Sequence, residues 1–271
     1  MKIFVYAAAS AISLIFVYPF YWMCVSAFRT QEAILSTPTR LLPESLDLTA
    51  FRSIASLGGT PLWIYAINSV FITIAATVIG VCATGVGAYA LYRRPGLKLF
   101  ATVRYGFLLT IMYPNMMLVI PLYFVVFKLG LLGSYAGIIL VMSLVPLMFF
   151  IFVQFFGSIP REVLEAASVD GASEWQTFVH IIVPIARPII LTASLIAFML
   201  NWKQWFPILV LSTTSDTYTL PVGLIALNTE YGINFQATMA LATLTVVPVV
   251  ALFLLTQRRV MGSFIAGAVK G

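Results

Sequence analysis

Charged residues are scarce in this chain of 271 residues: they make up 9% of it, whereas hydrophobic residues make up 61%. These fractions lie far from those of soluble domains and indicate a membrane protein. The net charge of +6 could suggest a nucleic-acid partner. However, the basic residues stand at the ends of apolar segments, as in membrane proteins whose positive loops face the cytoplasm. We therefore expect a lipid membrane, and no nucleic acid, among its partners.

Residues that carry out catalysis or bind metals are also few. His180 is the single histidine, and Cys24 and Cys82 lack the spacing of a metal site. An intramembrane enzyme would need a nucleophile with its base or a metal cluster, so we expect no catalytic and no metal-binding residue. The phosphate-binding motif G-x-x-x-x-G-K-[ST] is absent from the sequence. We therefore expect no cofactor in this chain and no ATP bound through that motif.

Long apolar runs dominate what is present. About 20 apolar residues cross the hydrocarbon core as a helix, and we predict an all-α membrane protein with six transmembrane helices in one domain, residues 1–271. The spans cover about 3–28, 63–91, 105–127, 136–156, 188–210 and 237–256. Pro114, Pro121 and Pro146 predict kinks in the third and fourth spans. None of the nine acidic residues lies in a span, which argues against a self-sufficient secondary transporter with an embedded ion site.

The basic residues predict the orientation. With both termini inside, ten of them fall on the inner side (Lys2, Arg93, Arg94, Lys98, Arg104, Arg161, Arg187, Arg258, Arg259 and Lys270) and four on the outer side (Arg29, Arg40, Arg52 and Lys128). This excess predicts an N-in, C-in topology. The outer segment 29–62 should contain a short amphipathic piece near residues 48–57 that lies along the membrane surface.

A polar segment, residues 157–187, separates the fourth and fifth spans. It holds four of the nine acidic residues, Glu162, Glu165, Asp170 and Glu174, which would be costly at membrane depth. Pro160 and the acidic residues predict a helix over 161–169. Gly171 can adopt a positive φ and reverse the chain, and a second helix over 173–182 should end near Pro184.

The pattern of this segment resembles the EAA loop of permease subunits of binding-protein-dependent ABC importers. The matching residues are Glu165, Ala166 and Ala167, then Gly171, Ile181 and Pro184, with Val183 where the family usually has leucine. Residues 18–22 (YPFYW), 26–29 (SAFR), 68–70 (NSV), 87–90 (GAYA), 120–123 (IPLY), 201–202 (NW) with 205 (W), and the ending 267–271 (GAVKG) are similar to the carbohydrate branch, in particular to the shorter maltose-type subunit.

This resemblance implies a type I importer transmembrane domain that forms half of a translocation pathway for a di- or oligosaccharide. The segment 157–187 would be a cytoplasmic coupling loop in which Glu165, Ala166, Ala167 and Gly171 contact an ATPase subunit and Asp170 supports the turn. The alternative is an amphipathic loop lying on the membrane surface. The implied partners are a second homologous permease, two ATPase subunits that bind ATP and Mg²⁺, and an extracytoplasmic sugar-binding protein, in a bacterial or archaeal cytoplasmic membrane.

Two further groups of residues are candidate contacts. Polar and aromatic residues in or near the spans could line the sugar pathway: Asn68, Asn115, Asn201, Trp202, Lys203, Gln204 and Trp205. Aromatic faces and amides suit sugars, but the tryptophans could equally form an interfacial belt with Lys203 reaching outward, and Asn68 and Asn115 favour interhelical hydrogen bonds. Lys203 also departs from the family pattern. In the outer loop 211–236, the resemblance makes Asp216, Asn228, Glu230 and Tyr231 candidates for contact with the binding protein, unless the loop is a solvated connector.

Overall fold

The computed structural model describes residues 1–271 except 45, 95, 97, 114, 231–233 and 269–271, and describes no side chains for residues 99–101, 115, 229–230 and 258–268. The described part is helical apart from one short β-hairpin, which agrees with the predicted fold class. In chain order the elements are α1 (Lys2–Ser26), α2 (Gln31–Ser36), α3 (Thr49–Ser53), β1 (Ser56–Leu57), β2 (Thr60–Pro61), α4 (Leu62–Arg93), α5 (Lys98–Met112), α6 (Asn115–Lys128), α7 (Tyr135–Met142), α8 (Pro146–Gly157), α9 (Arg161–Val169), α10 (Glu174–Gln176), the π-helix η1 (Thr177–Ile182), α11 (Val183–Trp202), α12 (Phe206–Leu211), the 3-10 helix η2 (Ser215–Thr217), α13 (Leu220–Glu230) and α14 (Phe235–Ala268).

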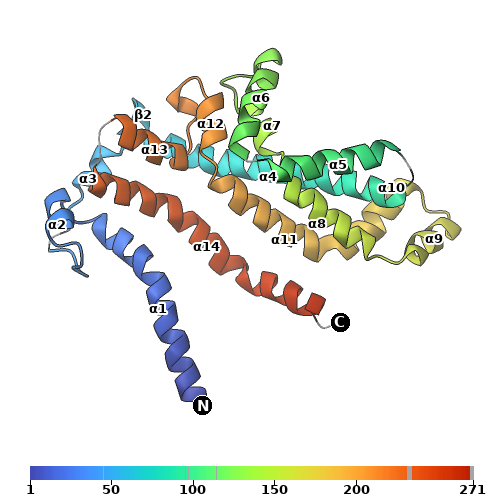
Figure 1. Ribbon diagram of the computed structural model, residues 1–271, viewed down its shortest axis with the longest axis horizontal. Coiled ribbons are helices and arrows are strands. Elements are labelled where there is room, and N and C mark those ends of the chain that lie inside the picture. The colour runs from blue at the N-terminus through green and yellow to red at the C-terminus, as the bar shows by residue number, and fades with distance from the viewer. Residues whose placement is uncertain (45, 95, 97, 114, 231–233, 269–271) are drawn as a thin grey trace.

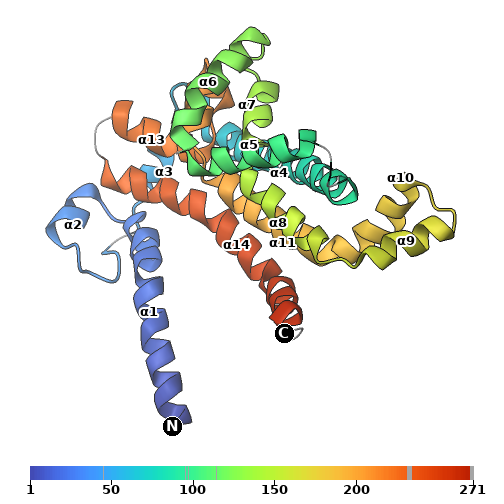
Figure 2. The ribbon, with the colours of Figure 1, turned by 45° about the vertical axis from the view of Figure 1, so that its right-hand side comes forward.

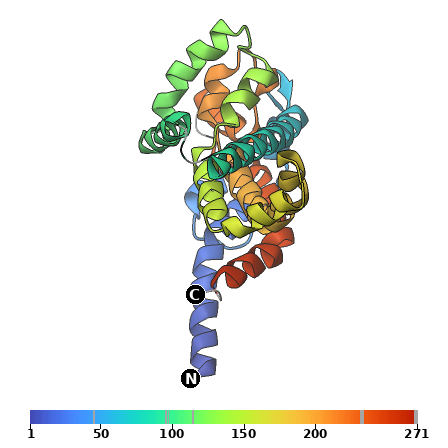
Figure 3. The same ribbon diagram turned by 90° about the vertical axis from the view of Figure 1, so that its right-hand side faces the viewer.

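The long helix α4 forms the centre of an elongated body and packs against both α8 and α11 (Figure 1). Helix α14 runs beside α11 and α13 and is the main contact of α1. Beyond that contact α1 extends away from the body, as Figure 3 shows, and Ser26 is its one buried residue. The apolar side chains of α1 are therefore free to face lipid or another membrane protein.

Three buried apolar clusters hold the helices together. One lies between α4, α8 and α11 around Phe149 and Phe152. A second joins α3, the β-hairpin, α13 and α14 around Tyr65 of α4. A third joins α4, α7 and α12 around Ile138 and Ile208. Because successive clusters share α4, this helix connects the two ends of the body.

Four helices are long and apolar enough to cross a membrane: Lys2–Ser26, Leu62–Arg93, Glu174–Trp202 and Phe235–Gln257. Three of them correspond to the first, second and sixth predicted spans. Helices α7 and α8 together reach the required length but are bent by 46°. The bend lies before Pro146, where Val145 leaves the helical region (φ −111°, ψ 87°) because a proline disfavours helical backbone at the preceding residue. The fourth predicted span is thus a broken helix.

The third predicted span, 105–127, is not one helix, which corrects the expectation of a kinked span. Helix α5 ends at Met112 and α6 starts at Asn115, and Figure 2 shows the two helices pointing in different directions. Neither apolar helix alone has the length of a span. Pro114 lies outside the described residues, but a proline here cannot donate a backbone hydrogen bond and restricts the residue before it, so the sequence favours a break.

The fifth predicted span also needs correction at both ends. Its helix begins at Glu174 rather than near residue 188, and it stops at Trp202, before the short helix α12. The second short helix of the polar segment therefore does not end near Pro184. The π-helix η1 accommodates this proline: the amide of Val183 donates to the carbonyl of Phe178, five residues back. Here the backbone hydrogen bonds change from the i→i−5 pattern of the π-helix to the i→i−4 pattern of α11. Pro184, which has no N–H, therefore costs few hydrogen bonds at this position.

The outer segment 29–62 is more structured than the single amphipathic piece that we predicted. The short helix α3 lies in the predicted stretch, and Asp47 accepts hydrogen bonds from both the hydroxyl and the amide of Thr49. These hydrogen bonds lower the pKa of the Asp47 carboxyl below its ordinary value. Gly58 and Gly59 form the hairpin turn with φ of 56° and 81°, the left-handed conformations that glycine adopts readily.

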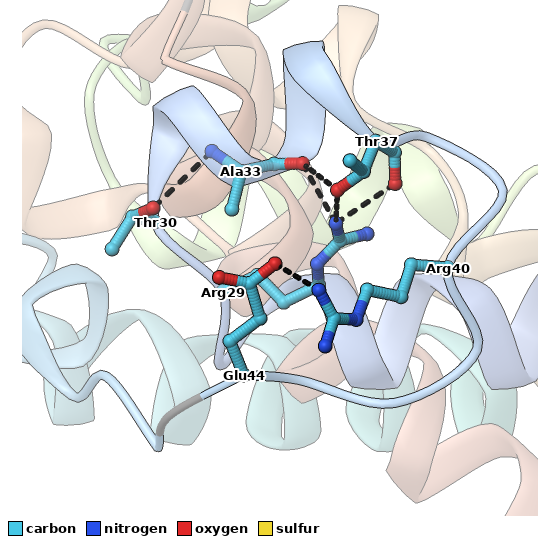
Figure 4. A network of polar contacts seen from close by, with 6 residues as sticks. All are labelled: Arg29, Thr30, Ala33, Thr37, Arg40 and Glu44. Atoms are coloured by element: carbon cyan, nitrogen blue, oxygen red, sulfur yellow. Dashed lines mark hydrogen bonds and ion pairs between the residues drawn. The ribbon is translucent and has the colours of Figure 1, made fainter.

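Arg29 fixes the beginning of this segment (Figure 4). Its side chain is buried, and Nη2 donates to the carbonyls of Ala33 and Thr37 at 2.7 and 2.8 Å and to the Thr37 hydroxyl at 2.7 Å. Both residues lie at the carboxyl end of α2, where a cation is favourable. Arg40 and Glu44 form an ion pair nearby. Arg29 therefore ties α2 to the end of α1.

Candidate functional site

The polar segment between the fourth and fifth predicted spans folds as a helical hairpin, here called the α9–α10 hairpin (residues 161–176). It projects from one end of the body (Figure 2). Helix α9 ends in a Schellman motif, in which the amide of Ala172 donates to the Ala167 carbonyl and that of Gly171 to the Ser168 carbonyl. Gly171 has φ +77°, so the predicted chain reversal at this glycine is confirmed.

Helix α10 starts with a capping box that sequence reasoning missed. The Ser173 hydroxyl accepts from the amide of Gln176 at 3.2 Å, and the Gln176 side chain accepts from the amide of Ser173 at 2.8 Å. The spacing S-x-x-Q at 173–176 is a known signal for such a start. Together the Schellman motif and the capping box satisfy backbone groups at the tip, so the turn between α9 and α10 is stabilised by its own hydrogen bonds.

Four of the five predicted coupling residues lie on the surface of this hairpin. Glu165, Ala166, Asp170 and Gly171 are exposed, and no atom would lie within 4 Å of a Cβ at position 171. Ala167 differs: it is 3% exposed and packs on the inner face of α9 together with Leu164. The four exposed candidates are thus two small residues, Ala166 and Gly171, and two carboxylates, and the large side chains of Val169 and Trp175 are exposed on the same hairpin.

A tertiary ion pair joins the hairpin to the body. Arg93, the last residue of α4, donates from Nη2 and Nε to the two carboxylate oxygens of Glu174, at 2.8 and 3.2 Å. No sequence signal points to this pair, because the two residues lie 81 positions apart. The pair fixes the start of α10 relative to the central helix.

The hairpin also continues without interruption into the body. Residues Glu174–Trp202 form one helix of 29 residues through α10, η1 and α11. A helix of this length spans about 43 Å at 1.5 Å per residue. The helix therefore connects the hairpin directly to Trp202 at its other end.

The candidate pathway residues at the far end of α11 do not gather in one site. Asn201 is buried and donates to the Thr77 hydroxyl of α4 at 3.3 Å. Trp202 is 5% exposed, stacks on Phe198, and donates to the Thr245 carbonyl of α14 at 3.1 Å. These two residues therefore face different helices and hold α11 between them.

Lys203, Gln204 and Trp205 form the break between α11 and α12. Lys203 is exposed, and Gln204 and Trp205 are partly buried. These three side chains remain accessible, unlike Asn201 and Trp202. Of the predicted pathway residues on this segment, they are the ones that a solute could reach.

Asn68 organises a polar network at the same end of the molecule. Its Nδ2 donates to the carbonyls of Asp216 and Tyr218 at 2.7 and 2.9 Å, and its Oδ1 accepts from the Tyr135 hydroxyl at 2.8 Å. The side chain is 3% exposed. It thus connects α4 with α7 and with the 212–219 connection, which agrees with the hydrogen-bonding role that we favoured from the sequence.

The predicted outer loop 211–236 is not a loop throughout, because it contains η2 and the helix α13. The first residues of α13 are buried, and an apolar run such as 220–227 is stable as a helix packed on α14.

The candidate contacts with a binding protein are spread over this segment. Asp216 is exposed and accepts from the Thr60 hydroxyl at 3.0 Å. Asn228 accepts from the Thr238 hydroxyl at 3.0 Å and so links α13 to α14. Tyr231 and the side chains of Asn115 and Glu230 lie outside the described residues.

Comparison with known proteins identifies the family of this architecture. The model of the family "Binding-protein-dependent transport system inner membrane component" matches residues 78–261, a range that includes the α9–α10 hairpin. The chain is 30% identical to the diacetylchitobiose uptake system permease protein DasC of Streptomyces coelicolor, over 94% of this chain and 92% of that one.

Two further relatives match over nearly their whole length. The chain is 30% identical to the arabinooligosaccharides transport system permease protein AraQ of Halalkalibacterium halodurans, with 96% and 93% of the two chains covered. It is 29% identical to the lactose transport system permease protein LacG of Rhizobium radiobacter, with 98% and 95% covered. The similarity to these relatives therefore extends over nearly the whole chain.

The fold is likewise shared with solved structures. A chain in the crystal structure of a bacterial ABC transporter involved in the import of the acidic polysaccharide alginate superposes with a TM-score of 0.79 at 22% identity, covering 95% of both chains. A chain of the MetNI methionine ABC transporter in an inward-facing conformation gives 0.58 at 20% identity, covering 74% of this chain and 95% of that one. The chain therefore belongs to the family of inner membrane components of binding-protein-dependent transport systems.

Proposed function

We propose that this chain is a permease subunit of an ATP-driven importer for a di- or oligosaccharide, and that it forms half of the translocation pathway together with a second, homologous permease. The relatives named above are permease proteins for diacetylchitobiose, arabino-oligosaccharides and lactose, which supports this class of substrate. Two ATPase subunits, with their ATP and Mg²⁺, and an extracytoplasmic sugar-binding protein complete the assembly. The chain itself carries out no bond chemistry.

The α9–α10 hairpin is the observation that carries this proposal. It presents Glu165, Ala166, Asp170 and Gly171 to solvent at the tip of a capped element. Small residues allow a partner to approach closely, and the flanking carboxylates give it an orientation. An ATPase subunit bound here would move the hairpin when the ATPase dimer closes, and the helix Glu174–Trp202 would transmit that movement to the far end of the pathway.

The topology that goes with this function has six spans, with both termini and the hairpin in the cytoplasm. Helices α1, α4 and α14, the bent pair α7–α8 and the helix Glu174–Trp202 have the length and composition for five of them. The pair α5–α6 would be the remaining, broken span. Lys203, Gln204 and Trp205 are accessible at the outer end and are the proposed solute contacts, while Asp216 is the exposed residue offered to the binding protein.

Uptake by the assembled transporter tests the coupling role. Gly171→Asp introduces a side chain and a charge on the exposed surface, and Glu165→Lys reverses a charge there. Both variants should insert normally but lose binding-protein-dependent sugar uptake and co-purification with the ATPase. Gly87→Ala, in α4 with no atom within 4 Å of the added Cβ, serves as the control that should transport normally. Normal uptake by both hairpin variants would refute the coupling role, and uptake by the purified chain alone would identify a secondary transporter instead.

Cysteine labelling tests the topology without requiring transport. Val169 is 87% exposed at the end of α9, and Thr214 is exposed in the connection after α12. After replacement of Cys24 and Cys82 by serine, a membrane-impermeant maleimide applied to intact cells should label Thr214→Cys but not Val169→Cys. The reverse pattern of labelling would overturn the proposed orientation.

A further inference from the structure

A pocket of about 490 Å³ lies between α4, α5 and the carboxyl end of α8. The helices that line it meet near the end of the body from which the α9–α10 hairpin projects (Figure 1). Its apolar lining, here called the apolar wall, includes Leu91, Leu108 and Val153, and Arg104 and Arg161 also line the pocket. Its volume is in the range of pockets that bind small molecules.

The two arginines leave a positive charge uncompensated. Both are exposed, and neither has an ion-pair or hydrogen-bond partner among the residues that the structure describes. Two tyrosines also line the pocket: the Tyr92 hydroxyl donates to the Ile159 carbonyl at 2.8 Å, whereas Tyr105 is exposed. The hydrogen-bonding groups left for a ligand are thus the two guanidinium groups and the Tyr105 hydroxyl, all of which can donate, and they favour an anion with several oxygens, such as a phosphate ester.

Polarity changes along the pocket in the same direction on two helices. Helix α5 begins at the hairpin end of the body (Figure 1), and along it Arg104 precedes Leu108 by about one turn. On α8, Val153 lies one turn before Gly157, and the chain then leads to Arg161 at the start of α9. The charged end therefore faces the hairpin side, and the apolar wall continues toward the middle of the body.

We propose that this pocket binds an anionic phospholipid. Its phosphate would lie between Arg104 and Arg161, and the part of an acyl chain nearest the headgroup would lie along Leu108 and Val153. Basic pockets between transmembrane helices are suited to anionic lipid headgroups. A free phosphate would neutralise the arginines but leave the apolar wall uncovered, where Leu108 and Tyr105 remain 39% and 66% exposed. The bound lipid would link α5 to the first residue of the hairpin, Arg161, and so make the position of the hairpin sensitive to lipid composition.

Native mass spectrometry of the purified full chain, in complex with whatever partner subunits remain bound, measures this directly. Phosphatidylglycerol should bind the wild-type chain more tightly than zwitterionic phosphatidylcholine. The double variant Arg104→Gln/Arg161→Gln should bind phosphatidylglycerol roughly 30-fold more weakly, because each basic residue beside an anionic lipid changes affinity about fivefold. Arg187→Gln, an exposed arginine outside the pocket, is the matched control and should bind like wild type.

Two further arms keep the result interpretable. Arg104→Lys/Arg161→Lys retains both charges and should recover most of the binding, which separates charge from a folding defect. In the wild type, a photoactivatable phosphatidylglycerol should crosslink to peptides containing Leu108 or Val153. Equal phosphatidylglycerol binding by wild type and the glutamine double variant, or crosslinks confined to other helices, would overturn the proposal. Displacement of the lipid by an equal concentration of glycerol phosphate would assign the site to a free phosphate ester instead. None of these outcomes depends on sugar transport.

Discussion

Arg93 and Glu174 join the last residue of the central helix to the first residue of α10 through two hydrogen bonds, at 2.8 and 3.2 Å. The Glu174 side chain is 58% exposed and that of Arg93 is 22% exposed. Partly exposed ion pairs stabilise by about 0.2–1 kcal/mol. The pair therefore contributes little to the stability of the whole fold, but it restrains the orientation of the element proposed to bind the ATPase.

Removal of this pair should loosen the hairpin locally. Arg93→Gln and Glu174→Gln should each raise the rate of proteolytic cleavage within residues 161–176 about twofold, as expected for a loss of ~0.5 kcal/mol, and the double variant should be no worse than either single variant. In the wild type, 0.5 M salt should produce a similar increase because it screens exposed charges. Arg187→Gln, at an exposed arginine of α11, is the control. Additive effects of the two single changes would show that the residues act independently.

Backbone strain should by itself make substitutions of Gly171 harmful. At φ +77° an alanine Cβ costs about 1–2 kcal/mol even though no neighbouring atom obstructs it. Gly171→Ala should therefore weaken ATPase binding by roughly tenfold, and Gly171→Asn by less, because asparagine tolerates this conformation better. Binding to the isolated ATPase subunit measures the effect. Equal losses for the two substitutions would point to contact with the partner rather than to strain.

Asn68 should matter for stability more than for solute recognition. Asn68→Ala leaves the carbonyls of Asp216 and Tyr218 without its amide, and it leaves the Tyr135 hydroxyl with only the Asp216 carbonyl, at 3.3 Å, as an acceptor. Loss of partners in a buried site should reduce the free energy of unfolding by about 2 kcal/mol. Tyr135→Phe, which removes one of these bonds, should cost about 1 kcal/mol, and Thr214→Ala, at an exposed residue, should be neutral. Thermal denaturation in detergent gives these values; an unchanged midpoint for Asn68→Ala would contradict the role of the network.

Gly80 allows close packing of α4 against the break between α7 and α8. A Cβ at position 80 would lie 2.5 Å from the carbonyl oxygen of Ser143, so backbone would have to move. Gly80→Ala should destabilise the chain by about 1–3 kcal/mol. Gly87→Ala in the same helix meets no atom within 4 Å and should be neutral or slightly stabilising. The same denaturation assay compares them, and equal midpoints would show that the contact yields easily.

The two tryptophans at the end of α11 should behave differently. Trp202 is 5% exposed and bonded to Thr245, so Trp202→Ala should cost about 3–5 kcal/mol and reduce assembly as well as uptake. Trp205 is only partly buried, and Trp205→Ala should reduce uptake while the assembled complex is retained. Co-purification with the ATPase, measured beside uptake, distinguishes the two effects. Loss of assembly with Trp205→Ala would place this residue in the core.

Sequence alone was sufficient where a short stretch of chain decides the outcome. Apolar run length predicted the long helices, because spanning a membrane requires about 20 apolar residues, and Gly171 predicted the reversal that the positive φ confirms. The charge density of residues 157–187 predicted a polar segment, which the exposed residues of the α9–α10 hairpin confirm, but Leu164, Ile182 and Ala186 of the same segment join the buried core. Pro146 likewise predicted an interrupted fourth span.

The tertiary structure decided what depends on residues distant in sequence or on a choice of backbone register. Pro184 suggested a helix end, but a π-helical turn absorbs its missing donor and makes the hairpin continuous with α11. The pairing of Arg93 with Glu174, the burial of Trp202 and the use of Asn68 as a bridge follow only from how α4, α11 and α14 pack. The side chains themselves were visible in the sequence; their partners were not, because packing of whole helices brings them together.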